Sequence, residues 1–267
     1  SVDLVRGIIM IIMALDHTRD FFGMPGASPT NLATTSFALF ATRWVTYFCA
    51  PVFFLLTGTG AYLSLRRRSA AQLSRFLFTR GLWLIFLETV VLRCLAYQFN
   101  VDYRVTMLLV LWSLGWAMIA LAALARLPVR AVVGAGLTMI LFHNLLDGAP
   151  FANPIWTVLH VPGFILNGPD HVVFAAYPLI PWIGVTAVGF GLGRIFDWES
   201  DRRRSFLLRL GLVVSAAFVA LRALNVYGDA ARWAPQRTAV FTVLSFLNTT
   251  KYPPSFLFLL MTLGPAL

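Results

Sequence analysis

Long apolar runs recur through this chain, and no other feature constrains its fold as strongly. About 20 consecutive apolar residues make a helix that crosses a hydrocarbon core of about 30 Å. The expected spans, each bounded by charge or by Pro and Gly, are 4–22, 38–64, 74–98, 104–126, 129–147, 174–196, 205–226 and 254–267. We therefore expect an all-α fold: a polytopic transmembrane bundle of about eight helices, some of them kinked at proline.

The composition favours the same fold. Only 12% of the residues are charged and 59% are hydrophobic, whereas a soluble domain has about 25% charged residues. We expect the lipid bilayer to cover the excess apolar surface of a single domain over residues 1–267. The chain opens at Ser1 without Met and stops at Leu267 inside an apolar run, so we expect a piece truncated at both ends.

The formal charge of +10 does not indicate a nucleic-acid partner. The arginines gather in short segments between apolar runs, at 66–80, 126–130 and 194–209, which are alternate loops. Cytoplasmic loops of membrane proteins hold the positive excess. We therefore expect the starting end to be cytoplasmic, with 148–173 and 227–253 as extracytoplasmic segments that fold in the plane of the membrane or re-enter it.

A histidine and an arginine share one face of the first expected helix. His17 follows Arg6 by eleven residues, which is almost three turns. Asp16 and Asp20 flank the histidine, and Asp20 is placed to accept its ring N–H and orient it as a general base. The alternative is a helix end whose polar residues meet lipid headgroups.

Glu88 lies near the middle of the third expected span. An unpaired carboxylate there would cost several kcal/mol, so we expect it to face protein or a water-filled cavity. Arg93 is too far round the same helix, which leaves Arg6, Arg43 and Arg80 as candidate partners. Structural pairing and catalysis both remain open for this residue.

Polar residues also gather near the expected outer side. His143 and Asn144 lie beside Asp147, and Asp170 and His171 precede the sixth span. Solvated loop histidines are the alternative to a functional site. No tight ligand spacing such as H-E-x-x-H is present, so we expect no metal.

Four stretches resemble the bacterial relatives of heparan-α-glucosaminide N-acetyltransferase, which acetylate across a membrane. They are 1–7 followed by His17, then 50–60, 177–184, and 251–255 running into 260–265. The arginine and histidine eleven apart are also similar to the wider superfamily of membrane acyltransferases that modify sugars. The lysosomal enzyme has Asn at position 17 and its catalytic histidine at the position of Ser28, so only a sugar-like acceptor is inferred.

The resemblance implies acetyl-CoA as the co-substrate and an essential His17 with Arg6 beside it. The catalytic candidates are His17, Arg6, Asp16, Asp20 and Glu88. Arginines suit phosphate binding, and the candidates for the CoA phosphates are Arg6, Arg66 and Arg80. The candidates for the acceptor are His143, Asn144, His171, Trp182, Lys251 and Tyr252.

The function expected is membrane acyl transfer from cytoplasmic acyl-CoA to a sugar or amino sugar on the extracytoplasmic side of a bacterial inner membrane. The alternative is a proton-coupled transporter or flippase for a cell-envelope precursor, with Glu88 on the proton path. A membrane scaffold ranks last, because it needs no intramembrane carboxylate. The sequence leaves the oligomeric state open.

Overall fold

The computed structural model describes residues 2–23, 26, 28–96, 99–149, 151 and 153–267. It divides into two compact units. Unit 1 comprises 1–53, 204–251 and 255–267, and unit 2 comprises 54–203 and 252–254. Helices α3 (Cys49–Ser64) and α9 (Ser200–Leu224) contribute residues to both units.

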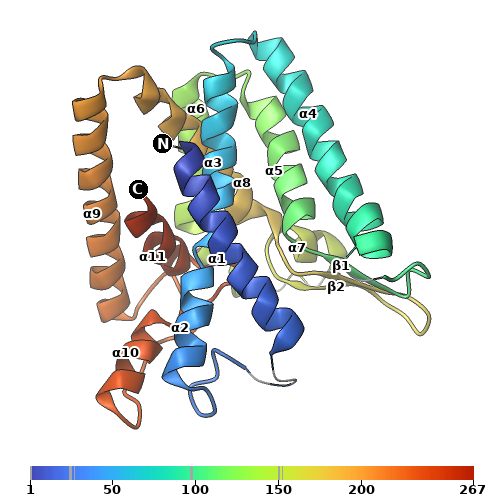
Figure 1. The fold of residues 1–267 in the computed structure, drawn as a ribbon, viewed down its shortest axis with the longest axis vertical. Helices are drawn as coiled ribbons and strands as arrows, with labels where there is room; N and C mark the ends of the chain where they lie inside the picture. Colours follow the sequence, from blue (N-terminus) through green and yellow to red (C-terminus); the bar gives the residue numbers. More distant parts are fainter. Residues whose placement is uncertain (1, 24–25, 27, 97–98, 150, 152) are drawn as a thin grey trace. The chain divides into compact units, whose positions relative to one another are not determined.

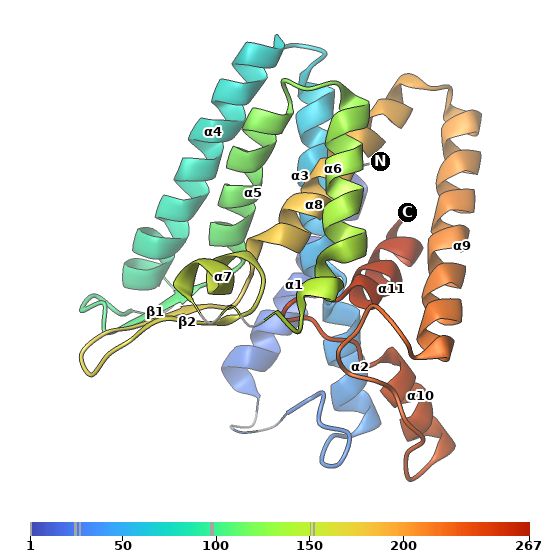
Figure 2. The same ribbon diagram turned by 180° about the vertical axis from the view of Figure 1, so that it is seen from behind.

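Unit 2 holds the α4–α5 and α6–α8 helix pairs beside its part of α3 (Figures 1 and 2). The bounds of its helices are α4 (Ala70–Phe86), η1 (Leu87–Ala96), α5 (Val110–Leu124), α6 (Val129–Phe142), η2 (His143–Leu146), α7 (Pro154–Leu159), α8 (Leu179–Leu192) and η3 (Gly193–Asp197). A hydrophobic core, which includes Leu73, Leu121 and Phe190, fills the space between these helices.

Glycines let the paired helices of unit 2 approach backbone to backbone. A Cβ atom on Gly115 of α5 would lie 2.6 Å from the carbonyl oxygen of Gly81 in α4. A Cβ on Gly184 of α8 would lie 2.9 Å from the carbonyl oxygen of Gly136 in α6. Small residues at helix contacts are typical of membrane bundles, and these glycines pack the helix pairs of unit 2 in that way.

A small sheet, which the all-α expectation missed, lies at one end of unit 2 (Figure 1). Its strands are β1 (Val105–Leu108), β2 (Gly163–Asn167) and β3 (Val172–Ala175), in the order β1-β3-β2. β1 pairs parallel to β3, and β2 pairs antiparallel to it. These short apolar runs are rich in β-branched residues, and hydropathy alone cannot distinguish such strands from the first turns of a helix.

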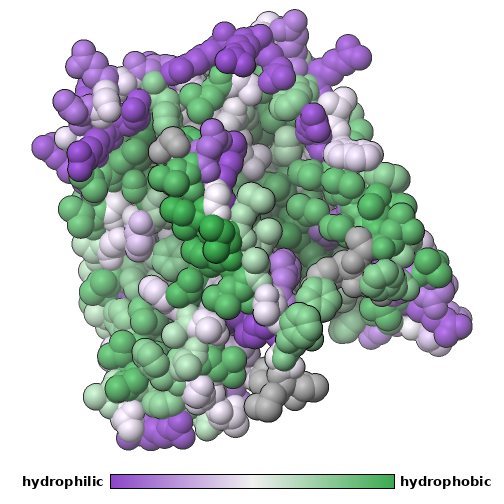
Figure 3. All heavy atoms as spheres, viewed as in Figure 1, coloured by the Kyte–Doolittle hydropathy of each residue, from purple (hydrophilic) through white to green (hydrophobic). Residues whose placement is uncertain are grey.

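The arginine-rich turns of unit 2 lie together at the end opposite the sheet. These are the α3–α4, α5–α6 and η3–α9 connections, where hydrophilic residues gather at the upper edge of Figure 3. Arg66 joins two of them, because it donates to Asp197 Oδ1 at 2.9 Å and to the carbonyl of Phe196 at 2.8 Å. The arginine-rich alternate loops therefore meet at one end of this unit. That this end faces the cytoplasm stays a prediction.

Unit 1 contains helices from both ends of the chain. They are α1 (Val2–Phe22), α2 (Phe37–Thr46), α10 (Ala239–Leu247) and α11 (Phe256–Ala266), with the first residues of α3 and most of α9. α1 contacts α2, and α10 contacts α2 as well. A Cβ on Gly211 of α9 would lie 2.8 Å from the carbonyl oxygen of Gly264 in α11, so these two helices also touch through backbone.

Among the described residues, four helical segments are long and apolar enough to cross a membrane: Phe37–Ser64, Val129–Leu146, Leu179–Asp197 and Ser200–Leu224. The expected count of about eight spans is not confirmed. The expected span 104–126 begins with strand β1, which leaves α5 only 15 residues, and α11 has 11 residues. α1 is 21 residues long, but its charged residues lower its hydropathy.

Candidate functional site

A cluster of charged and polar side chains surrounds Asp16 in unit 1. Thr46 Oγ1 donates to Asp16 Oδ1 at 2.7 Å, and Arg43 Nη1 donates to the same oxygen at 3.1 Å. Arg19, one turn further along α1, donates to it as well. Arg43 and Thr46 are three residues apart on α2, so both reach α1 from one helix face. The side chains of Asp16, Arg19 and Arg43 are 14–18% exposed.

Lys251 adds a further positive charge to this cluster. Its ammonium group lies 5.7 Å from the centre of the Tyr47 ring and acts electrostatically on Asp16. Lys251 is 7% exposed. Because Arg19, Arg43 and Lys251 supply three cations against the carboxylates of Asp16 and Asp20, the cluster has an excess of positive charge. Such an excess can stabilise a negative charge that develops during a reaction.

α1 turns Asp16 inward and His17 outward. Ile9, which is 5% exposed, and Asp16 are seven residues apart and mark the packed face. His17 follows Asp16 by about 100° round the helix, and its side chain is exposed. Met10 lies between Arg6 and His17 along α1 and is 58% exposed. The face of α1 that Arg6 and His17 were expected to share is therefore not its packed face.

The other two α1 candidates pair with charges of their own helix. Arg6 Nη1 lies 3.2 Å from Asp3 Oδ1. Asp20 Oδ1 accepts from Arg19 Nη2 at 3.2 Å, so Arg19 is a cationic partner of Asp20. The expected role of Asp20 in orienting His17 stays a prediction.

Glu88 caps a helix, and the expectation of an arginine partner is wrong. Its Oε1 accepts from the backbone N–H of Leu109, and its Oε2 accepts from those of Leu111 at 2.6 Å and Trp112 at 3.0 Å. These amides belong to the first turn of α5, where backbone N–H groups lack partners within the helix. The positive end of the helix dipole also favours a carboxylate there.

Arg93 is buried and follows Glu88 by five residues, but its hydrogen bond goes to Thr106. Its Nη1 donates to Thr106 Oγ1 at 2.7 Å, and its guanidinium lies 4.0 Å from the centre of the Tyr103 ring. It therefore fastens η1 to strand β1 and the segment before it.

The histidines and carboxylate at the end of α6 come together as a cluster. His160 Nε2 lies 2.9 Å from Asp147 Oδ1, and Asn144 Nδ2 donates to Asp147 Oδ2 at 2.8 Å. Partial burial of Asp147 disfavours its charge, but these two hydrogen bonds outweigh that effect and lower the pKa of its carboxyl. His143 is 2% exposed, and its ring meets that of His160 edge-on with centroids 5.7 Å apart.

Three other acceptor candidates lie in different surroundings within unit 2. His171 is exposed, and its Nδ1 is 3.1 Å from the carbonyl oxygen of Tyr103. Trp182 is fully buried and stacks on Phe54 with centroids 4.5 Å apart, so it belongs to the core. Tyr252 Oη lies 3.3 Å from Tyr177 Oη.

The arginine end of unit 2 contains an open groove between α4 and α5 of about 560 Å³. Arg75 and Arg126 line it together with Ala71, Ser74, Phe78, Ile119, Ala122 and Ala123. Of the arginines expected to hold CoA phosphates, Arg66 binds Asp197, and Arg80 lies 5.6 Å from the centre of the Phe76 ring. Arg75 and Arg126 were not among the arginines predicted from the sequence to bind the CoA phosphates.

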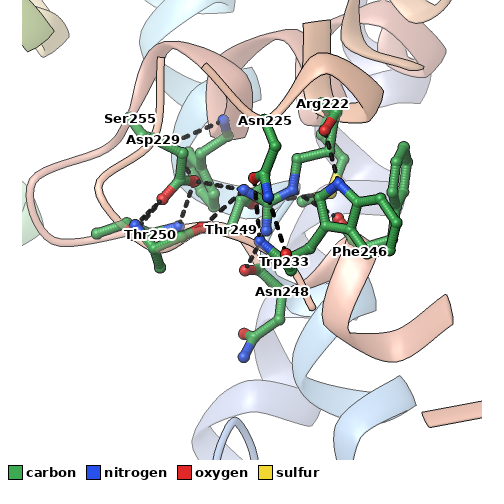
Figure 4. A network of polar contacts seen from close by, with 12 residues as sticks. Arg222, Asn225, Asp229, Trp233, Phe246, Asn248, Thr249, Thr250 and Ser255 are labelled. Carbon is green, nitrogen blue, oxygen red and sulfur yellow. Dashed lines mark hydrogen bonds and ion pairs between the residues drawn. The ribbon is translucent and has the colours of Figure 1, made fainter. Parts of the chain in front are cut away.

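A polar network in unit 1 was also missed (Figure 4). Arg222, 1% exposed, donates only to backbone carbonyls in the hydrogen bonds that the structure describes: those of Phe246, Ala231, Ser245 and Asn248, at 2.8–3.2 Å. Asp229 accepts from Thr250 Oγ1 at 2.7 Å and from Ser255 Oγ at 2.8 Å. The network folds the segment after α9 and places Lys251 beside it. In the sequence, the feature that could have indicated this network is an arginine, Arg222, in the last turn of an apolar helix.

These features define a helical integral membrane protein with a half-buried, predominantly cationic cluster. The chain belongs to the family described as heparan-alpha-glucosaminide N-acetyltransferase, catalytic, which matches residues 1–229. Membership implies a membrane enzyme of the acetyltransferase type, and the family uses acetyl-CoA as co-substrate. Comparison with curated proteins finds no match, and comparison with solved structures finds none either.

Proposed function

We propose that this protein transfers an acetyl or other acyl group from cytoplasmic acyl-CoA to a sugar or amino sugar at the extracytoplasmic side of the membrane. The observation that carries this proposal is the Asp16 cluster, which lies next to His17. Its members other than Lys251 fall within the stretch that the family covers. A scaffold would have no use for three cations around one half-buried carboxylate in an otherwise apolar helix bundle.

His17 is proposed to act as the general base. Its exposed ring can meet an acceptor, while Asp16 on the next position of the helix is fixed by Thr46 and Arg43. The acceptor O–H or N–H gives its proton to an imidazole nitrogen, the acceptor atom bonds to the thioester carbonyl carbon, and the C–S bond breaks to release CoA. In the covalent version, His17 itself first takes the acyl group and then passes it to the acceptor.

The cations around Asp16 are proposed to stabilise the oxyanion that forms on the thioester carbonyl. Arg19, Arg43 and Lys251 are held by hydrogen bonds or ring contacts before a substrate binds. Preorganised charge of this kind lowers the barrier because it needs no rearrangement during the reaction.

For the CoA phosphates, we propose the arginine end of unit 2 in addition to Arg6. Arg66 and Arg80 remain candidates, and the groove lined by Arg75 and Arg126 offers two guanidinium groups at an open surface. For the acceptor, the proposed contacts remain His143, Asn144, His171, Trp182, Lys251 and Tyr252. Burial of Trp182 favours an indirect contribution through the shape of the core.

The test is turnover of radiolabelled acetyl-CoA by the purified full-length protein in lipid. The His17→Ala variant should lose CoA release by about 100-fold or more, as expected when a general base is removed. Thr18→Ala is the matched control, because Thr18 is the exposed neighbour whose hydroxyl bonds only to Ala14 of its own helix in the described hydrogen bonds. Equal turnover by His17→Ala and wild-type protein would overturn the role of His17.

The alternative function, a proton-coupled transporter or flippase, depends on a carboxylate that can take up and release protons. Glu88 is occupied by three backbone amides, which favours a fixed structural role over a place on a proton path. Proton-dependent flux in vesicles with no acyl transfer would nevertheless favour the transporter.

A further inference from the structure

His143, Asp147 and His160 form a compact group at the end of α6 in unit 2. One ligand atom from each residue lies within 4.8 Å of the others. His143 is the first residue of the 3-10 helix η2, and Asp147 directly follows its last residue. His160 comes from the C-terminal end of α7. Two separate segments thus bring together two imidazoles and one carboxylate.

His143 is the strongest sign that the group binds a ligand. Its side chain is 2% exposed, and neither ring nitrogen has a hydrogen-bond partner among the described residues. A neutral imidazole carries one N–H donor and one lone pair, and burying both without partners is unfavourable. Coordination of the lone pair removes part of that cost. The ring of His143 also lies against that of His160, toward the same carboxylate.

The surroundings hold the other two ligands in place. Asn144 donates to Asp147 Oδ2, which leaves Oδ1 toward His160 Nε2 at 2.9 Å. An outer hydrogen bond that orients a coordinating carboxylate is common in metal sites. Trp156 packs against the His160 ring with centroids 5.0 Å apart. His160 is 0% and Asp147 28% exposed at the side chain, so the site is dry on one side and accessible on the other.

We propose that His143, Asp147 and His160 bind a divalent transition-metal ion, with Zn²⁺ as the preferred ion. Two histidines and one carboxylate form a common three-ligand set for Zn²⁺, with water or another ligand in the fourth position. Mg²⁺ and Ca²⁺ are disfavoured because they prefer oxygen ligands. Tetrahedral ligands at 2.0–2.1 Å from the ion lie about 3.3 Å apart, so side-chain movements of about 1 to 2 Å complete the site.

The bound ion would join the end of α6 to the end of α7 across the connection 148–153. This inference does not depend on acyl transfer. It also differs from the expectation of no metal, which rested on the lack of a short ligand motif. His160 is separated from Asp147 by thirteen residues, and only the fold brings the two together.

Metal uptake by the full-length protein in detergent tests the proposal, with any affinity tag removed and no acyl-CoA present. After chelator treatment and equilibration with Zn²⁺, wild-type protein should retain one ion per chain by elemental analysis. Co²⁺ in its place should give the visible absorption of a tetrahedral site. His160→Ala and Asp147→Asn should each weaken Zn²⁺ binding by about 100-fold. Removing a residue that only hydrogen-bonds to a metal ligand already costs about 10–100-fold, and loss of a ligand itself should cost at least as much.

His171→Ala is the matched control, because it removes an exposed histidine of the same unit that lies outside the group. It should bind Zn²⁺ as the wild type does. His143→Ala should also weaken Zn²⁺ binding, but this variant removes a buried ring. If it fails to fold, Asp147→Asn still tests the metal site, since the Asp147 side chain is partly exposed and asparagine keeps its shape. Wild-type protein that retains no more Zn²⁺ than His160→Ala, or that binds Mg²⁺ in preference, would overturn the proposal.

Discussion

Replacing Glu88 by Gln should destabilise the protein without touching the proposed reaction centre. Glu88 accepts three backbone N–H groups with two charged oxygens. Gln keeps one acceptor oxygen, so it can retain the two bonds from Leu111 and Trp112 but turns its NH₂ group toward the N–H of Leu109. One hydrogen bond to a charged group is worth about 1.5–3 kcal/mol, and the lost charge at a helix N-terminus adds about 0.3–1 kcal/mol.

The sum is about 2–4 kcal/mol, because Glu88 is only 7% exposed and solvent screening is weak. A change of 1 kcal/mol shifts the melting temperature of a chain of this size by about 2–4 °C. We therefore expect Glu88→Gln to melt roughly 4–16 °C below wild type, measured by circular dichroism in detergent. Glu199→Gln, the same exchange at an exposed glutamate before α9, should change stability by less than about 0.5 kcal/mol.

Two results would refute this reasoning. The first is a melting temperature for Glu88→Gln that equals that of Glu199→Gln, which would mean that the amides of α5 do not need the carboxylate. The second is a variant that keeps its stability but loses CoA release, which would assign Glu88 to the reaction and not to the cap.

Two further predictions concern packing and the polar network. Gly115→Val should destabilise by about 1–3 kcal/mol, because its side chain meets the backbone of Gly81; Gly134→Val, where nothing lies within 4 Å, is the control in thermal melts, and equal melting of the two variants would contradict the contact. Arg222→Met should destabilise by about 3–5 kcal/mol, because it leaves the buried carboxylate of Asp229, 3.8 Å from Arg222 Nη1, without its cation and removes the donor of four backbone carbonyls. Limited proteolysis should then cut the segment 225–250 first, whereas an unchanged cleavage pattern would argue against this role.

The helical fold could be predicted from the sequence because long apolar runs and alternating arginine segments are strong one-dimensional signals. The prediction failed where a short apolar run had two possible conformations. Residues Val105–Leu108 were assigned to a span, but they pair with β3 as a strand. One continuous apolar stretch contains both strand β1 and helix α5, and hydropathy does not show where the strand ends and the helix begins.

Only some features of the candidate site could be predicted from the sequence. Position 16–17 was singled out, but helix periodicity could not decide which of Asp16 and His17 packs against α2 until the partners Arg43 and Thr46 were placed. Glu88 was expected to need a charged partner, and it found backbone amides instead, which no sequence pattern reveals. Lys251 reaches the Asp16 cluster from the far end of the chain, and such long-range proximity requires the fold.

The Arg222 network has a consequence for how this family can vary. In its described hydrogen bonds, Arg222 recognises only main-chain carbonyl oxygens of the segment it holds, such as those of Ala231 and Phe246. Every residue type carries that group, so the hydrogen bonds of Arg222 do not depend on which side chains stand at positions such as Ala231 and Phe246. Asp229 is different, because its carboxylate lies 3.8 Å from Arg222 Nη1 and accepts from Thr250 and Ser255. Relatives are therefore expected to vary at positions such as Ala231, while Arg222 and Asp229 preserve the path of the segment.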